Sequence, residues 1–173
     1  MGLDMYLEGK FYFGGRFNED KDIIELKRKV LWEKEEVIYR INTQLIESIT
    51  LSLCYWRKVN AIHKWFVDNC FEGEYDEYKG EDIDVSISQL KKLKDICKDV
   101  LDLLSEAKDY KTKKDIIDRL LPMQDGFFFG FDDSEEGIEY YIEDIKETIP
   151  KLDNALKVIE QYNLGYAVYC ASW

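Results

Sequence analysis

Residues 49–66 read ITLSLCYWRKVNAIHKWF, and the spacing of their apolar residues changes partway along. From Ile49 to Tyr55 apolar and polar residues alternate, which predicts a strand with one buried face. From about Arg57 to Phe71 the apolar residues recur at helical spacing, which predicts an amphipathic helix. A strand that leads directly into such a helix indicates a fold in which helices pack on a sheet. The predicted core stripe of the helix consists of Val59, Ile62, Phe66 and Cys70.

Before this junction the sequence predicts one more strand and a long helical segment. Residues 1–13 alternate in polarity, and the glycine pair at 14–15 ends that strand. Between Asp20 and Ile46 the apolar residues recur every three or four positions. This spacing predicts one helix or two over that range.

After the junction, residues 72–84 are rich in acids and contain two glycines, which predicts an exposed loop. Ser86 and Gln89 form a capping box that begins the next helix. Thr112 is predicted to cap a short helix that ends before Pro122. Residues 127–131, FFFGF, follow a turn signal and predict a short aromatic strand.

The last part of the chain keeps one helical phase from Ile138 to Tyr162. Pro150 is predicted to kink this helix or to restart it, and Gly165 to end it. Residues 166–173 predict a final strand. The expected fold is α+β: a single domain over residues 1–173, with a small antiparallel sheet of about four short strands packed with four or five helices.

Composition limits the class of protein. The 36 acids exceed the 24 lysines and arginines, so the net charge of −12 opposes direct nucleic-acid binding. No apolar run is long enough to span a membrane and no signal peptide is seen, so we expect a cytoplasmic protein. The four cysteines are expected to be free thiols. With a single histidine, His63, and no ligand cluster, the sequence predicts neither a metal nor a cofactor.

The strand-to-helix junction also carries the densest group of chemically useful side chains. An aromatic platform, cations, an amide and an imidazole together suit a planar, anionic ligand. Core packing remains the simpler role for the tryptophan and the histidine, and a solvated face the simpler role for the cations. The predicted ligand-binding residues are Trp56, Arg57, Lys58, Asn60, His63, Lys64, Phe128 and Trp173.

Four blocks of sequence resemble a family of small phage and prophage proteins. They are MGLDMYL at 1–7, YWRKVNAIHKWFVDN at 55–69, LPMQDGFFFG at 121–130 and the ending YCASW at 169–173. The chain departs from that family's pattern in residues 20–46 and in the loop after Cys70. The resemblance implies an accessory protein of a bacterial cytoplasm, of a kind that counters host defence.

The sequence supports three hypotheses for function. The first is a binding protein that sequesters a small anionic, nucleotide-like ligand without turnover. The second is an acidic inhibitor that docks on a host or defence protein through residues 72–84. The third is a hydrolase with His63 as general base beside Asp4 or Asp68. No catalytic nucleophile or phosphate-loop motif is found, and homodimer formation is left open.

Overall fold

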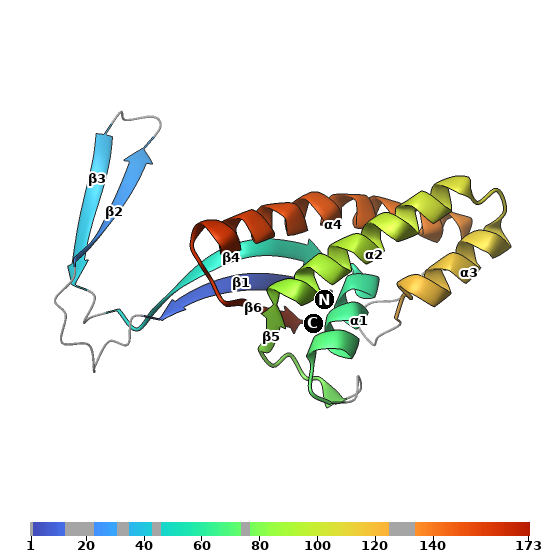
Figure 1. Cartoon of the computed structure of the whole chain (residues 1–173), viewed down its shortest axis with the longest axis horizontal. Coiled ribbons are helices and arrows are strands. Elements are labelled where there is room, and N and C mark those ends of the chain that lie inside the picture. Colours follow the sequence, from blue (N-terminus) through green and yellow to red (C-terminus); the bar gives the residue numbers. More distant parts are fainter. Residues whose placement is uncertain (1, 13–22, 31–34, 43–45, 74–76, 125–133) are drawn as a thin grey trace. The chain divides into compact units, whose positions relative to one another are not determined.

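A computed structural model describes residues 2–12, 23–30, 35–42, 46–73, 77–124 and 134–173. The chain forms two compact units, of which the first contains residues 1–9 and 52–173 and the second residues 10–51. Figure 1 labels the helices and strands of both units. Residues 127–131, predicted to form an aromatic strand, lie outside the described residues.

The first unit is built on a four-stranded antiparallel sheet with the strand order β4-β1-β6-β5. Asp4 pairs with Ser172 and Glu8 with Val168, which places the first and last strands side by side. Leu3, Met5 and Leu7 are completely buried, as the alternation of residues 1–13 predicts. The strands are β1 (Asp4–Tyr12), β4 (Ser48–Arg57), β5 (Ile83–Ser86) and β6 (Tyr166–Ser172).

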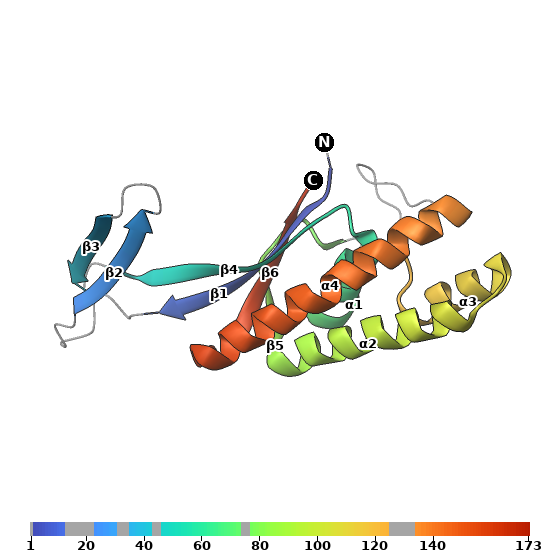
Figure 2. The same cartoon turned by 90° about the horizontal axis from the view of Figure 1, so that it is seen from above.

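The described residues of this unit contain four helices. The helices α2 and α4 run side by side, as Figure 1 and Figure 2 both show. Two polar contacts attach α4 to β4: Trp56 Nε1–H donates to Thr148 Oγ1 at 3.0 Å, and the Cys54 thiol donates to the Lys151 carbonyl at 3.4 Å. The α+β prediction is therefore confirmed. The helices are α1 (Asn60–Cys70), α2 (Ile87–Glu106), α3 (Tyr110–Leu120) and α4 (Glu135–Gln161).

Aromatic rings fill the core between α1 and the sheet. Phe66 is fully buried and stacks on Tyr169, with ring centroids 4.1 Å apart. The rings of Trp56 and Trp65 lie 5.9 and 5.4 Å from the Phe66 ring. Offset and edge-to-face pairs of this kind add to the free energy gained from burial alone. Phe66 therefore lies at the centre of the contacts that join α1 to the sheet.

The prediction of a helix from Asp20 to Ile46 is wrong. Residues 23–30 and 35–42 instead form two antiparallel strands, β2 (Ile23–Val30) and β3 (Glu35–Asn42), within the second unit. The register places Ile24 opposite Ile41 and Leu26 opposite Tyr39. Residues 24–27 also alternate apolar and charged positions, a period that competes with the helical one. The β-branched and aromatic residues of this segment favour the strand.

One predicted helix end is confirmed and two need correction. The capping box of Ser86 and Gln89 is confirmed at the start of α2. Asp109, rather than Thr112, caps α3, and its carboxylate accepts the backbone N–H of Thr112 at 2.9 Å. Asn163, with φ of 52°, takes the left-handed position after α4 that Gly165 was predicted to occupy. Asparagine tolerates this conformation better than most residues.

The predictions for the last helix and for the acidic loop each need an adjustment. The helix α4 continues through Pro150, so the predicted helix from 138 to 162 begins earlier and is not divided. Residues 83–84 of the predicted acidic loop belong to β5. None of the described helices is long and apolar enough to cross a membrane. All four cysteines are free thiols.

Candidate functional site

The chain changes from strand to helix within two residues at the end of β4. Lys58 has φ of 62°, a left-handed conformation that is unfavourable for a residue with a side chain. Its N–H donates to the Leu3 carbonyl at 2.7 Å, which fixes the turn against the residue before β1. Helix α1 then begins at Asn60 with no side-chain cap and no acid in its first turn. Its first N–H groups therefore carry partial positive charge without a carboxylate to offset it.

This turn forms one wall of a cleft of about 560 Å³. We call it the α1–α4 cleft, because the opposite wall comes from the first half of α4. Pockets of this size suit a small organic ligand. The cleft is lined by Arg57, Lys58, Val59, Asn60, Ala61, Met123, Gly137, Tyr140, Tyr141, Glu143, Asp144 and Glu147.

The two walls of the cleft carry opposite charges. Arg57 and Lys58 are exposed on the α1 side, and the Arg57 guanidinium lies 3.9 Å from the Asp4 carboxylate. On the α4 side, burial and then the charge of Glu147 raise the pKa of Asp144 to about 6. A fraction of Asp144 is therefore protonated near neutral pH and can donate a hydrogen bond. The cleft thus suits a ligand that is anionic at one end and carries polar hydrogen-bonding groups at the other.

An exposed aromatic ring on α4 also lines the cleft. The Tyr140 side chain is 59% exposed, and its hydroxyl donates to Glu136 at 3.2 Å. The neighbouring Tyr141 is buried, and its hydroxyl donates to the Leu121 carbonyl at 2.9 Å. Tyr140 can therefore offer a face for stacking while Tyr141 supports the wall behind it. Tyr140 was not predicted as a site residue, because its only signal in the sequence is an aromatic residue on the polar side of an amphipathic helix.

Three predicted site residues, Arg57, Lys58 and Asn60, meet in the α1–α4 cleft. Trp56 does not join them: it is 1% exposed, and its indole N–H is bonded to Thr148 in the core. Lys64 lies further along α1, where its ammonium pairs with Asp68 at 3.0 Å. Phe128 lies outside the described residues.

His63 and Trp173 form a separate aromatic group at the end of β6. His63 is 2% exposed, and its Nδ1 lies 2.8 Å from the Tyr169 hydroxyl. The rings of Tyr78 and Trp173 each lie 5.7 Å from the imidazole. Burial lowers the pKa of His63 to about 4, so the imidazole is neutral at physiological pH. This setting is that of a structural histidine within the core.

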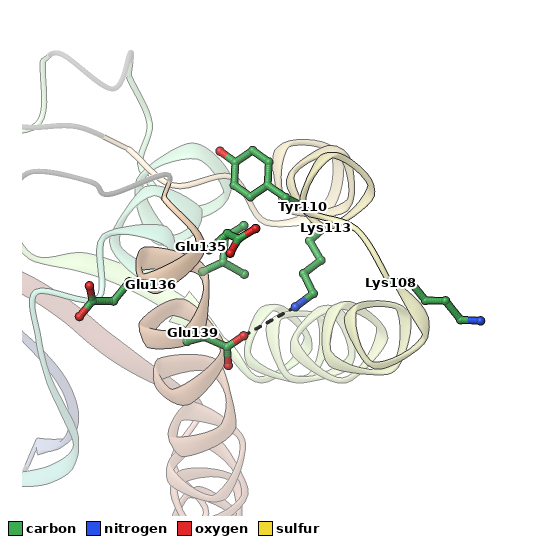
Figure 3. Close-up of a pocket in the computed structure, with 7 residues that line it drawn as sticks. Lys108, Tyr110, Lys113, Glu135, Glu136 and Glu139 are labelled. Carbon is green, nitrogen blue, oxygen red and sulfur yellow. Dashed lines mark ion pairs between the residues drawn. The ribbon is translucent and has the colours of Figure 1, made fainter.

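A second pocket, of about 390 Å³, lies between the beginnings of α3 and α4. The Lys113 ammonium lies 3.6 Å from the Glu139 carboxylate. Figure 3 marks this ion pair and shows Lys108 pointing away from it. Here Ser134 caps α4, and Glu135 and Glu136 occupy its first turn. These groups already satisfy and offset the helix N-terminus. The α1–α4 cleft, whose helix has neither, is therefore the stronger candidate for an anion.

Comparison with protein-family models, curated proteins and solved structures finds no match for this chain. Within the described ranges, no group of three or more histidine, cysteine, aspartate or glutamate residues is placed to hold a metal ion.

Proposed function

We propose that this chain binds a small anionic, nucleotide-like ligand in the α1–α4 cleft and holds it without turnover. One observation carries the proposal: Arg57, Lys58 and the uncapped start of α1 line the same cleft as Tyr140 and Asp144. A phosphate has complementary charge to the first set of groups, and a nucleobase fits the second.

The proposed ligand is oriented by the asymmetry of the cleft. Its phosphate lies at the start of α1, where the positive end of the helix dipole and two cations line the cleft. Its base stacks on Tyr140, and its polar edge bonds to Asn60 and to the Asp144 carboxyl. A protonated Asp144 donates to a ring nitrogen or carbonyl of the base, whereas an ionised one accepts from an exocyclic amine. Tyr140 thus replaces Trp56 as the stacking residue of the original hypothesis.

The biological setting of the proposal comes from the resemblance of four sequence blocks to phage and prophage proteins. In that setting, a protein that sequesters a nucleotide signal in the bacterial cytoplasm counters host defence. The hydrolase hypothesis has weaker support. The pKa of His63 is lowered to about 4, which makes it a poor general base. Its side chain is also buried, so a ligand cannot reach it.

The proposal predicts which substitutions weaken ligand binding. AMP, GMP, CMP, UMP and inorganic phosphate are titrated into the protein by isothermal calorimetry. Arg57→Gln and Lys58→Gln should each lower the affinity for the best-binding nucleotide at least about tenfold, because a charge-assisted hydrogen bond contributes about 1.5–3 kcal/mol. Tyr140→Ala should lower the affinity for nucleotides but not for phosphate, since phosphate makes no stacking contact.

Two variants serve as controls for this experiment. Lys64→Gln removes an equal charge from α1 but outside the cleft, so this variant should bind nucleotide with the affinity of the parent protein. Lys58→Gly removes the side chain and relieves the left-handed backbone, so it weakens binding while stability is retained or raised by up to about 1 kcal/mol. Unchanged affinity in both Arg57→Gln and Lys58→Gln contradicts the proposed site.

One observation favours the inhibitor hypothesis as a second candidate. Tyr78 is 4% exposed, and its hydroxyl accepts the backbone N–H of Ala171 at 3.2 Å, which anchors the acidic segment to β6. Glu77, Glu81 and Asp82 are exposed around this anchor. A fixed acidic surface of this kind suits a basic partner protein.

Neutralising that surface separates the two functions. A Glu77→Gln, Glu81→Gln, Asp82→Asn variant and the parent chain are each used to capture proteins from a bacterial lysate. Under the inhibitor hypothesis, a host protein co-purifies with the parent chain and is lost from the variant, because electrostatic attraction is removed. Nucleotide affinity stays unchanged, since none of the three lines the α1–α4 cleft. An equal yield of partner with both chains argues against this hypothesis.

A further inference from the structure

The sheet of the first unit has one face that points away from its helices. In Figure 2 the helices α1, α2 and α4 lie on the same side of the sheet. Leu7 of β1 pairs with Tyr169 of β6, whose ring stacks on Phe66 of α1, so this side of the sheet faces the helices. Asp4 and Tyr6 are an odd number of residues from Leu7, so their side chains point to the opposite side. We call that opposite side the open face.

Two tyrosine rings lie side by side on the open face. The ring centroids of Tyr6 on β1 and Tyr55 on β4 are 5.3 Å apart, and these residues are 37% and 44% exposed. The Tyr55 hydroxyl donates to Oδ1 of Asp4, which holds the ring beside that carboxylate. An exposed aromatic ring next to a carboxylate attracts a cation both by the cation–π interaction and by charge.

The charges on these strands also favour a cationic partner. Glu8 of β1 and Asp84 of β5 both pair with Val168 of β6, the residue before the helix-facing Tyr169, so they add two acids to the open face. Within the described part of the first unit, Arg57 is the only basic residue of the four strands. Its side chain is 66% exposed, and its Nε lies 3.9 Å from Oδ1 of Asp4, which is longer than a hydrogen bond. The Asp4 carboxylate can therefore accept a second guanidinium.

We propose that the open face docks a basic segment of a partner protein through arginine side chains. Their guanidinium groups stack on the rings of Tyr6 and Tyr55 and donate to the carboxylates of Asp4 and Glu8. Arginine suits this surface better than lysine, because its planar group matches both an aromatic ring and a carboxylate. A second copy of this chain is a poor occupant, since each copy carries a net charge of −12. None of these four residues lines the α1–α4 cleft or belongs to the acidic residues 72–84.

The test uses the peptide acetyl-GRGRG-amide as its probe. Its citrulline counterpart has nearly the same shape without the charge, and its lysine counterpart has the charge without the planar group. Each peptide is titrated into the ¹⁵N-labelled 173-residue chain while the backbone amide signals of β1 and β4 are recorded. We expect the arginine peptide to shift the signals of Tyr6 and Tyr55 in a saturable way. The lysine peptide should bind at least about threefold more weakly and the citrulline peptide at least about tenfold more weakly.

Substitutions separate docking at this face from general attraction to an acidic protein. Tyr6→Ala combined with Tyr55→Ala should lower the affinity for the arginine peptide at least about fivefold, and Asp4→Asn by a similar factor. Tyr162→Ala and Asp118→Asn are the matched controls, since they remove an exposed tyrosine and an exposed acid outside the strands. Both controls should bind the arginine peptide like the parent. Circular dichroism confirms that each variant keeps the fold.

The proposal is overturned if the arginine peptide leaves the signals of Tyr6 and Tyr55 unmoved, if the citrulline peptide binds equally well, or if the double variant binds like the parent. It is also overturned, in favour of a second copy, if sedimentation finds a dimeric parent and a monomeric double variant. The double variant should keep the nucleotide affinity of the parent, because neither tyrosine lines the α1–α4 cleft.

Discussion

Phe66→Ala should lower the free energy of unfolding by about 4 kcal/mol, the largest loss expected from any single change proposed for this chain. Phe66 has no exposed surface and stacks on Tyr169 at 4.1 Å. Removing the ring leaves a cavity between α1 and the sheet and breaks its contacts with Trp56 and Trp65. Urea denaturation followed by far-ultraviolet circular dichroism measures the loss.

The other aromatic at the end of this helix provides a control. Phe71 follows α1 and is only partly buried, with its ring 5.4 Å from that of Tyr78. Phe71→Ala should lower the free energy of unfolding by no more than about half as much, because less apolar area returns to water. Equal losses from Phe66→Ala and Phe71→Ala would show that Phe66 is not the centre of this core.

Local patterns were enough to predict most of the first unit. The change of period at residues 55–60 correctly predicts β4 and α1, because strand and helix bury different sets of side chains. The same method failed at residues 20–46, where Ile23, Leu26 and Val30 also fit a helical stripe. The pairing of Ile24 with Ile41 makes that segment a strand rather than a helix. Such a contact between distant residues is not visible in a local pattern.

Prediction of the site was limited because some of its residues lie far apart in the sequence. Arg57, Lys58 and Asn60 were found because they are neighbours at one junction. Tyr140 and Asp144 were missed because only the packing of α4 brings them there. Trp56 was predicted to bind the ligand, but it belongs to β4, whose pleat turns its side chain into the core towards Thr148.

In the parent protein, the effects of His63 and Asp144 on the pH dependence of stability should largely offset each other. His63 has a folded pKa of about 4 against 6.5 in the unfolded chain. Between these values the unfolded chain binds more protons, so the free energy of unfolding falls by about 3 kcal/mol as the pH falls from 6.5 to 4. The pKa of Asp144 is raised from 3.8 to about 6, so the folded chain binds more protons in nearly the same window. Acidification therefore stabilises the fold through Asp144, by about 2 kcal/mol after allowance for its partial exposure.

Asp144→Asn should expose the His63 effect. Between pH 6.5 and pH 4 this variant should lose about 2 kcal/mol more stability than the parent, measured by urea denaturation at half-unit intervals. Adding His63→Gln, which keeps a polar partner for the Tyr169 hydroxyl but does not titrate, should remove that extra loss. All three proteins share every other carboxylate, including the Asp68 charge that raises the His63 pKa slightly, so differences between them isolate the two groups. A parent and an Asp144→Asn variant with parallel pH profiles would mean that Asp144 titrates at its ordinary pKa, and its proposed role as a hydrogen-bond donor to the ligand would then fail as well.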